Sequence, residues 1–193
     1  MTTAIDCEYT VEGTGPPLVL IHGIGAARDA WRFMVPALRE HFTVISYDLR
    51  GHGTSPVPDE EFGLDELVAD LERVRQRTGI EKAHFAGHSL GGQIGPAYAR
   101  TYPDRVLSLG LLSTAAFRTE DDSAKVWGVV KAMQEKGIAQ VLETLTARWF
   151  TDEFRRSSRP CRAPPETGHR NRSRHLHERV PHLCRNRNGT LAA

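Results

Sequence analysis

Short apolar runs alternate with helix-like patterns as far as residue 112, and this alternation constrains the fold more than any other feature. Turn-forming residues bound four apolar runs that predict buried strands, at residues 18–21, 42–47, 83–86 and 106–112. Helical spacing occupies the intervals at residues 31–40 and 64–74, and a third helix is expected to end at Tyr102, before Pro103. Strands separated by such helices predict an α/β fold with a mostly parallel sheet and flanking helices. Near-continuous apolar runs also predict strands covered on both faces, and residues 5–11 predict an edge strand.

The pattern changes after residue 112. Residues 122–136 and 138–150 have the spacing of two amphipathic helices, which predicts the start of a helical cap inserted over the sheet. From residue 155 the periodicity stops: the last 39 residues hold ten arginines, no lysine and two acids, Glu166 and Glu178. Their net charge of +8 leaves −7 for residues 1–154, and low hydrophobicity with high charge predicts disorder. The predicted division is a core at 1–117, a partial cap at 118–154 and a tail at 155–193.

Several classes of protein are not expected. The apolar runs are too short to cross a bilayer, and the first residues lack the basic start and apolar stretch of a secretory signal. The three cysteines, Cys7, Cys161 and Cys184, are far apart, so neither a disulfide framework nor a close-spaced zinc motif is written in the sequence. We therefore expect a cytoplasmic protein with no metal and no cofactor.

The strongest chemical signal is a G-x-S-x-G pattern centred on Ser89, between a predicted strand and a predicted helix. A tight, strained turn at such a junction presents the serine hydroxyl above the sheet. Glycines are needed on either side because side chains would collide where strand and helix approach. The helix N-terminus behind the turn also favours negative charge near the serine. Ser89 is therefore the candidate catalytic nucleophile.

A second signal follows the first strand, in His22-Gly23-Ile24-Gly25. In this architecture the loop supplies one backbone donor of an oxyanion hole, and the residue after the nucleophile supplies the other. The predicted donors are the N–H groups of Ile24 and Leu90. The same loop also resembles a dinucleotide-binding turn, with Asp48 near the ribose position. Arg28, however, occupies the place where close helix–strand packing needs a small residue.

The other candidates have ordinary structural explanations. His52 is expected to tie down its own loop rather than to act as a base. His84, inside a strand, is expected to be a packed or hydrogen-bonded histidine. His88 adjoins the nucleophile, but the turn aims neighbouring side chains in different directions. Trp31 is expected in the core rather than in a binding pocket.

With these motifs in view, the sequence resembles the α/β-hydrolases. The resemblance covers about residues 5–154 and rests on the segments at 22–25, 47–55 and 87–92. Shorter similarities at residues 82–87, 112–116 and 147–151 are typical of 3-oxoadipate enol-lactonases and related lactonases and esterases. The resemblance implies a serine hydrolase of small carboxylic esters or lactones, using a Ser–acid–His triad in that chain order.

The triad acid and histidine cannot be assigned from the sequence. Both should follow later strands, which the sequence from residue 155 does not predict. That segment has four histidines but no aspartate, and Gly168-His169 only mimics the expected motif. The arginine-rich tail resembles out-of-frame translation of a GC-rich gene, with a frameshift near codons 155–158. On this interpretation the fold is incomplete at its C-terminus and the chain is expected to be inactive as written.

Two alternatives stay open. The same fold and oxyanion hole serve C–C bond hydrolysis and cofactor-free haloperoxidase chemistry. A non-enzymatic alternative has the arginine-rich tail bind nucleic acid through its phosphates, with a steep salt dependence. The tail has no aromatic residue on which bases could stack, so a small ester or lactone is the expected partner and nucleic acid is not. The sequence gives no oligomeric state.

Overall fold

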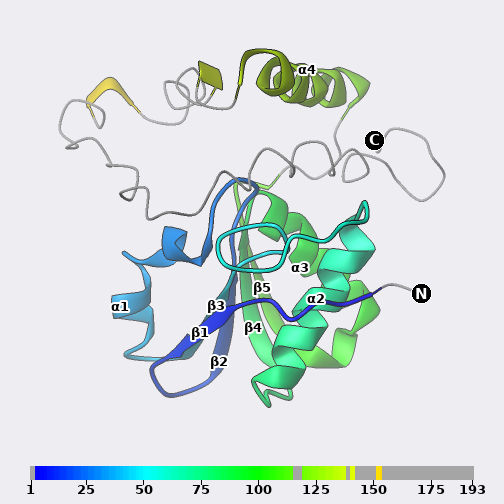
Figure 1. Cartoon of the computed structure of the whole chain (residues 1–193). Coiled ribbons are helices and arrows are strands. Elements are labelled where there is room, and N and C mark those ends of the chain that lie inside the picture. The colour runs from blue at the N-terminus through cyan, green and yellow to red at the C-terminus, as the bar shows by residue number, and fades with distance from the viewer. Residues whose placement is uncertain (1–2, 115–118, 138–139, 142–150, 154–193) are drawn as a thin grey trace. The chain divides into compact units, whose positions relative to one another are not determined.

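The computed structural model describes residues 3–114, 119–137, 140–141 and 151–153 (Figure 1). The described residues up to 114 belong to one compact unit and those from 119 onward to a second. The elements of the first unit are β1 (Tyr9–Glu12), β2 (Pro17–Ile21), η1 (Arg28–Trp31), α1 (Val35–Leu38), β3 (Thr43–Tyr47), α2 (Leu64–Arg77), β4 (Ala83–His88), α3 (Leu90–Thr101), η2 (Pro103–Arg105) and β5 (Val106–Leu112). The second unit contains α4 (Glu120–Lys136).

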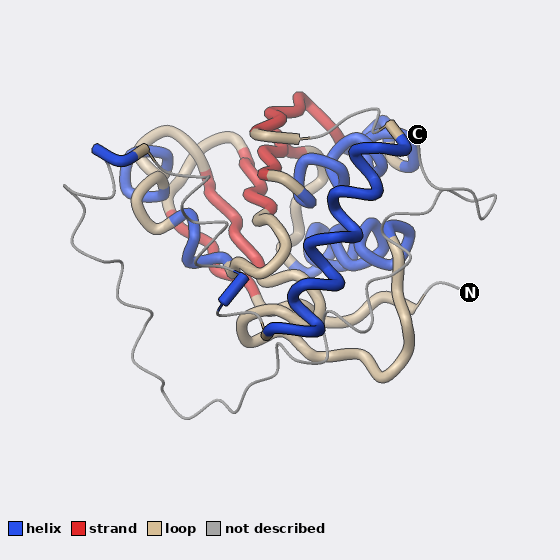
Figure 2. The backbone as a smooth tube through the Cα atoms, turned by 90° about the horizontal axis from the view of Figure 1, so that it is seen from above, coloured by secondary structure: helices blue, strands red, loops and turns tan. Residues whose placement is uncertain are grey.

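The sheet of the first unit has the order β1-β3-β2-β4-β5. β3, β2, β4 and β5 are parallel to their neighbours, and β1 pairs antiparallel with β3 at one edge. Figure 2 shows the strands in a row with helices on both sides of the sheet. The predicted α/β architecture with a mostly parallel sheet is therefore confirmed. The edge strand begins later than expected, at Tyr9 rather than at residue 5.

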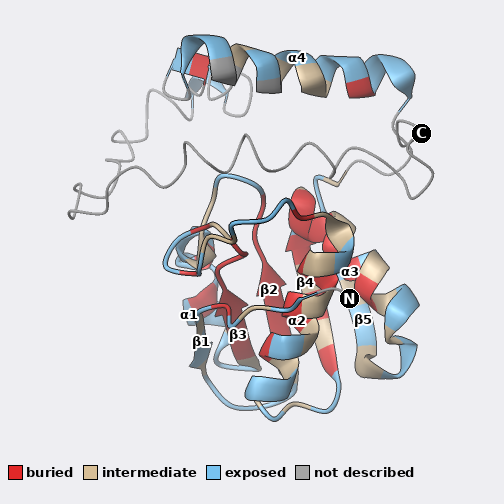
Figure 3. Cartoon of the chain, turned by 45° about the vertical axis from the view of Figure 1, so that its right-hand side comes forward, coloured by how far each residue is buried: buried red, intermediate tan, exposed pale blue. Residues whose placement is uncertain are grey.

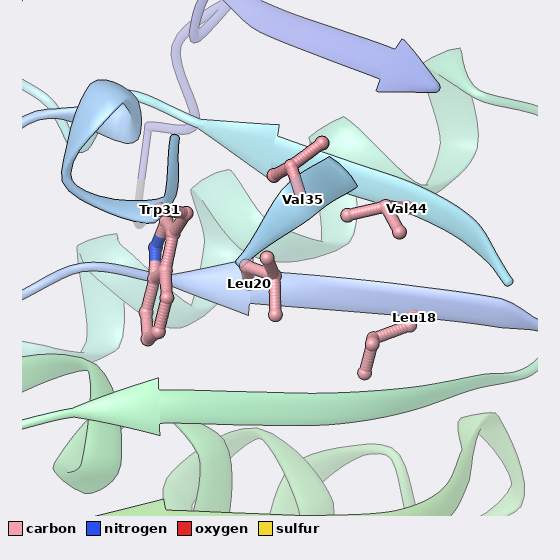
Figure 4. Close-up of a cluster of buried hydrophobic side chains, with 5 residues drawn as sticks. All are labelled: Leu18, Leu20, Trp31, Val35 and Val44. Atoms are coloured by element: carbon pink, nitrogen blue, oxygen red, sulfur yellow. The ribbon is translucent and has the colours of Figure 1, made fainter. Parts of the chain in front are cut away.

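The central strands form the core, since residues 18–21 of β2 and 44–47 of β3 are buried in continuous runs. On one face a cluster of apolar side chains fills the space under η1 and α1 (Figure 4), namely Leu18, Leu20, Trp31, Val35 and Val44. Each fully buried side chain of this size contributes about 1.5–3 kcal/mol relative to exposure. Trp31 is a core residue, as expected. On the other face α3 packs against β4 and β5, and α2 packs against α3.

The helix predicted over residues 31–40 is wrong. The segment instead forms two short turns, η1 and α1, separated by residues 32–34. Pro36 lies in the first turn of α1, the place in a helix where the missing N–H of a proline costs least. A continuous helix through Pro36 would lose a hydrogen bond and clash with the preceding turn.

The expectation that the apolar strands are covered on both faces fails for β5. Only Val106 and Leu109 are partly buried, and Leu107 and Leu111 are 50% and 53% exposed. Figure 3 shows this strand mostly in the colour of exposed residues, in contrast to β2 and β3. The reason is its position, because β5 pairs only with β4 among the described strands.

In the second unit, α4 confirms the helix predicted over residues 122–136 and extends it by two residues at its start. Of the second predicted cap helix, at 138–150, only residues 140–141 are described. The tail at 155–193 lies outside the described residues. No helix in the described part of the chain is both long enough and apolar enough to cross a membrane.

Candidate active site

Two loops begin at the carboxyl ends of neighbouring parallel strands, one after β2 and one after β4. The chain passes from β2 to β3 on one side of β2 and then returns to β4 on its other side. In open α/β sheets, connections that diverge from neighbouring strands leave a crevice beyond their carboxyl ends, where ligands bind. Ile21 pairs with Gly87 in the register of these two strands. The residues that follow each strand therefore begin side by side.

Ser89 is the single residue between β4 and α3, and its backbone adopts a conformation that residues with side chains rarely take. Its φ is 53° and its ψ is −110°, outside the regions free of steric conflict. Such strain persists only where the surroundings hold it in place, and it concentrates at functional sites. Here the Ser89 N–H donates to the Leu112 carbonyl at 3.0 Å, which ties the turn to the end of β5.

Glycines on both sides of Ser89 allow the strand, the turn and the helix to approach one another. A Cβ at Gly87 would collide with the backbone of Gly91, and a Cβ at Gly91 would collide with the Ile21 carbonyl in β2. A Cβ at Gly92 would overlap the side chain of Thr114. The first turn of α3 is therefore packed directly against the backbone of the sheet.

The loop after β2 lies against Ser89. A Cβ placed on Gly23 would be 3.2 Å from the Ser89 Cβ and 3.1 Å from the His88 Nδ1. Only glycine allows so close an approach without displacing its neighbours. Ile24 follows with an exposed side chain, and Gly25 has a φ of +75° that completes the turn.

The N–H groups of Ile24 and Leu90 lie on these two adjoining loops. Leu90 is the first residue of α3, where an N–H group has no partner inside the helix. Neither N–H donates a hydrogen bond to another described residue. The Ser89 hydroxyl likewise has no hydrogen-bond partner within the described residues. The structure thus brings together the two loops that carry all three predicted site residues.

Two buried histidines hold the loop after β2. The His22 Nδ1 donates to the Gly23 carbonyl at 2.7 Å, and its Nε2 accepts from the Leu49 N–H at 3.0 Å. The His52 Nε2 accepts from the Gly25 N–H at 3.0 Å, and its Nδ1 donates to the Arg50 carbonyl at 3.0 Å. The two rings meet edge to face, with centroids 5.2 Å apart. His52 therefore ties its own loop to the neighbouring one, in agreement with its expected structural role.

Asp48 is fully engaged within the protein. Its carboxylate accepts hydrogen bonds from the backbone N–H and the guanidinium of Arg28, at 2.7 and 2.6 Å, and from the Thr54 N–H at 3.0 Å. The side chain is only 2% exposed. In the sheet, β2 lies between β3 and β4. In the dinucleotide-binding fold, the first parallel strand instead lies between the second and the fourth. The structure therefore does not support the dinucleotide-binding alternative.

A buried ion pair anchors the loop that carries His52. The Arg50 guanidinium donates to both carboxylate oxygens of Asp70 in α2, at 2.6 and 2.7 Å. Arg50 also donates to the Thr3 carbonyl at 3.0 Å, and the Ile5 N–H donates to Asp70 at 2.8 Å. Burial raises the pKa of Asp70, while the hydrogen bonds from Arg50 and Ile5 oppose that rise. The N-terminal segment, α2 and the loop are joined through this one contact.

Among the described residues, no histidine is hydrogen-bonded to the Ser89 hydroxyl. His84 bonds to the Ser108 hydroxyl at 2.8 Å across β4 and β5, consistent with its predicted role. His88 is exposed and its Nδ1 lies toward Gly23. The tail histidines lie outside the described residues. No group of three or more potential metal ligands occurs among the residues that the structure describes.

Comparison with known proteins identifies the family. The sequence pattern of the alpha/beta hydrolase fold matches residues 16–174, which is most of the chain. The chain belongs to the α/β-hydrolase fold family. The fold predicted from the sequence is thereby confirmed, together with the resemblance to enol-lactonases among its relatives.

Members of the α/β-hydrolase fold family with different activities are similar to this chain. The acetyltransferase component of the acetoin cleaving system of Cupriavidus necator is 36% identical over 144 residues, covering 74% of this chain and 38% of that protein. The 3-oxoadipate enol-lactonase 2 of Acinetobacter baylyi is 30% identical over 140 residues, covering 72% and 51%. A thermophilic esterase from Thermogutta terrifontis superposes with a TM-score of 0.71 at 28% identity, covering 79% and 57%. The chain spans 38% of the length of the acetyltransferase component, and 51% and 57% of the lengths of the enol-lactonase and the esterase.

Sequence reasoning located the strained turn at Ser89 but missed how the neighbouring loop is held. The dipeptide His22-Gly23 has two structural roles. Its glycine makes room for Ser89, and its histidine binds the loop backbone. The contact of Thr114 with Gly92 left no signal in the sequence, because it joins residues that only the fold brings together.

Proposed function

We propose that this chain carries the nucleophile and the oxyanion hole of a serine hydrolase that acts on small carboxylic esters or lactones. Ser89 is the nucleophile, and the backbone N–H groups of Ile24 and Leu90 stabilise the oxyanion. The observation that carries the proposal is the strained turn at Ser89, packed directly against Gly23 of the neighbouring loop.

The chemistry follows from the charge that develops during acyl transfer. The Ser89 Oγ attacks the substrate carbonyl and gives up its proton to a general base, and the carbonyl oxygen becomes an anion as the C=O double bond opens. The double bond then re-forms, the acyl C–O bond breaks, and the alcohol leaves with that proton. Two fixed N–H donors aimed at the carbonyl oxygen stabilise that anion. In enzymes of known mechanism, removing one such donor raises the activation free energy by several kcal/mol. The N-terminus of α3, twelve residues long, adds a favourable dipole at the same place.

The substrate class is supported by the relatives. An enol-lactonase and an esterase both align over more than 70% of this chain, and the family match at residues 16–174 includes both loops of the candidate site. Esters and lactones share the acyl carbonyl that this arrangement would polarise. The same arrangement serves other acyl substrates, so the ester or lactone assignment comes from similarity and not from the site.

The proposal is tested by selective labelling of Ser89 with a fluorophosphonate, read by intact mass and peptide mapping. One reaction per chain suffices, so completed turnover is not needed. The Ser89 hydroxyl without a base reacts slowly, but the same two N–H donors would stabilise the phosphoryl oxygen as the Ser89 oxygen adds to phosphorus and fluoride leaves, so Ser89 should react faster than the other serines. We expect a single adduct on Ser89 that disappears in Ser89→Ala.

The matched control is Ser108→Ala, since Ser108 is an exposed serine on β5 away from the turn. This variant should be labelled at the wild-type rate. Labelling spread over several serines, or an adduct that survives Ser89→Ala, would contradict the proposal.

A further inference from the structure

Two buried histidines bind the backbone on either side of Ile24, and nothing in the proposed acyl transfer uses their side chains. We infer that His22 and His52 are positioning residues that aim the Ile24 N–H into the oxyanion hole, each acting as the neutral tautomer with its proton on Nδ1. This inference rests on the proposed function and adds to it the two side chains that fix the direction of the Ile24 N–H.

The hydrogen bonds of His22 define its tautomer. A carbonyl oxygen can only accept, so the contact of 2.7 Å with the Gly23 oxygen requires a proton on Nδ1. The Leu49 N–H can only donate, so the contact of 3.0 Å with Nε2 requires a free lone pair there. Both bonds are satisfied only by a neutral ring protonated on Nδ1.

His52 is protonated in the same way, but the nitrogen that faces the loop after β2 is its Nε2 rather than its Nδ1. Its Nδ1 faces the Arg50 carbonyl and must carry a proton, and its Nε2 faces the Gly25 N–H and must not. Both rings are almost completely buried, at 1% exposure for His22 and 7% for His52.

Peptide geometry turns these contacts into control over the Ile24 N–H. The Gly23 carbonyl and the Ile24 N–H belong to one planar trans peptide, in which C=O and N–H point in opposite directions. Holding the carbonyl with His22 therefore fixes the direction of the N–H. His52 holds the next peptide through the Gly25 N–H. Both peptide planes that flank Ile24 are thus held, each by one histidine.

The histidines are themselves attached to a rigid support. Their other ring nitrogens bond to the backbone of Leu49 and Arg50. That loop is held by the contacts of Asp48 with Arg28 and by the buried pair of Arg50 with Asp70. Burial is the main cause that lowers the pKa of His22 to about 4, which keeps its ring neutral near pH 7.

Amide substitutions separate this role from simple filling of space. Asparagine can place its amide NH₂ near the position of Nδ1, and glutamine can place its carbonyl oxygen near the position of Nε2. His22→Asn therefore preserves the donor to Gly23, and His22→Gln removes it. The order is reversed at position 52, where His52→Gln preserves the acceptor for Gly25 and His52→Asn removes it.

The experiment measures the rate of Ser89 labelling by the fluorophosphonate in the full chain and in these four variants. We expect labelling about tenfold or more slower in His22→Gln and His52→Asn, because a misdirected oxyanion donor loses much of its stabilisation. His22→Asn and His52→Gln should restore most of that rate. A role in packing alone predicts no such reversal between the two positions.

Protonation is measured separately on the wild-type chain by long-range ¹H–¹⁵N spectra of its histidine rings near pH 7. We expect a proton on Nδ1 and none on Nε2 for both residues, and a proton on Nε2 of either ring would overturn the inference whatever the variants do. If wild-type Ser89 is not labelled, the proposed function fails and the inference fails with it. If wild-type Ser89 is labelled but the order of variants does not reverse, only the inference fails.

Discussion

Individual glycines set the position of Ser89, because the strained turn exists only where the surrounding backbones come into direct contact. A backbone conformation of this kind costs about 1–3 kcal/mol and must be offset by its neighbours. Gly91 provides one such contact, since its Cα faces the Ile21 carbonyl with no room for a methyl group. Gly95 lies one turn later in the same helix, and apart from its chain neighbours a Cβ there would meet the flexible end of Leu109 at 3.4 Å.

Gly91→Ala should therefore cost more than Gly95→Ala. We expect Gly91→Ala to lower the free energy of unfolding by about 1–3 kcal/mol, as overpacking does, and to slow the labelling of Ser89. Gly95→Ala should change the free energy of unfolding less, because the gain of up to about 1 kcal/mol in helix propensity opposes the steric conflict of a Cβ with Pro96, the next residue. Denaturant unfolding measures both. Equal destabilisation by the two substitutions would mean that helix packing in general, and not the contact with Ile21, limits the turn.

His22 gives the chain a specific dependence of stability on pH. Burial holds its pKa at about 4 against an ordinary value of 6.5, with His52 lowering it further and Gly23 and Asp48 opposing. Because the unfolded chain binds a proton between these values and the folded chain does not, stability should fall as pH drops from about 6.5 to 4. At 1.36 kcal/mol per unit the loss reaches about 3 kcal/mol.

Unfolding measured by urea at intervals of half a pH unit tests this prediction. His22→Asn removes the titrating ring and should flatten the curve between pH 6.5 and 4. A slope that is the same in this variant and in the wild type would assign the acid sensitivity to other groups.

At the scale of the elements, the carboxylate of Glu72 in α2 is hydrogen-bonded to Tyr98 in α3. Glu72 accepts hydrogen bonds from the Tyr98 hydroxyl at 2.7 Å, from two guanidinium nitrogens of Arg75 at 2.7 and 2.8 Å, and from Gln76 at 3.0 Å. Burial alone would raise the pKa of Glu72, but these donors outweigh it and hold the pKa at about 2. Tyr98 is completely buried and carries this contact across the helix interface.

Tyr98→Phe should lower the free energy of unfolding by about 1.5–3 kcal/mol at pH 7, the range for a hydrogen bond to a charged group. The lowered pKa means that the contribution of ionised Glu72 is complete above about pH 4.5 and is lost as pH falls through about 2. The difference between variant and wild type should shrink over that interval. Tyr102→Phe, the same change in the ring stacked beside Tyr98, is the control and should have little effect at any pH.

The elements differ in how far the sequence predicts them. β2, β3, α2, α3 and β5 follow from local periodicity, because their apolar residues recur at the spacing that each structure requires. The spacing around Pro36 predicts one helix over residues 31–40, but it carries no information about the break between η1 and α1. Burial of β5 could not be read from its apolar run, since it depends on which strands and helices lie beside it.

The site is predictable to the same extent. Local sequence locates Ser89 and the candidate donors Ile24 and Leu90, because each loop and the glycines in it are contiguous in the chain. The hydrogen bonds of His22 to Leu49 and of His52 to Gly25 each span 27 residues. Periodicity carries no information about such contacts, so they appear only once the loops are brought together by the sheet.

At the scale of the whole molecule, β5 is an edge strand among the described strands, and it exposes Leu107, Leu111 and Leu112. It contains no charged residue and no proline, and an edge strand without either is a template for pairing with another chain. Leu111→Lys places a charge on its exposed surface and should reduce concentration-dependent association, measured by light scattering. Phe33→Lys is the control, since Phe33 is 80% exposed but lies outside the strands. An equal reduction by both changes would show that exposed apolar area in general, and not β5, drives association.

Turnover is a property of the whole molecule, because it needs a base and an acid in addition to the nucleophile and the donors. Among the described residues no histidine is hydrogen-bonded to the Ser89 hydroxyl, and a neutral hydroxyl is a poor nucleophile near pH 7. We therefore expect hydrolysis of p-nitrophenyl acetate by this chain to be slow and unchanged in Ser89→Ala, even where fluorophosphonate labels Ser89 selectively. Hydrolysis that is fast and lost in Ser89→Ala would contradict this expectation. It would also mean that the chain supplies a base to Ser89 from residues outside the described ranges.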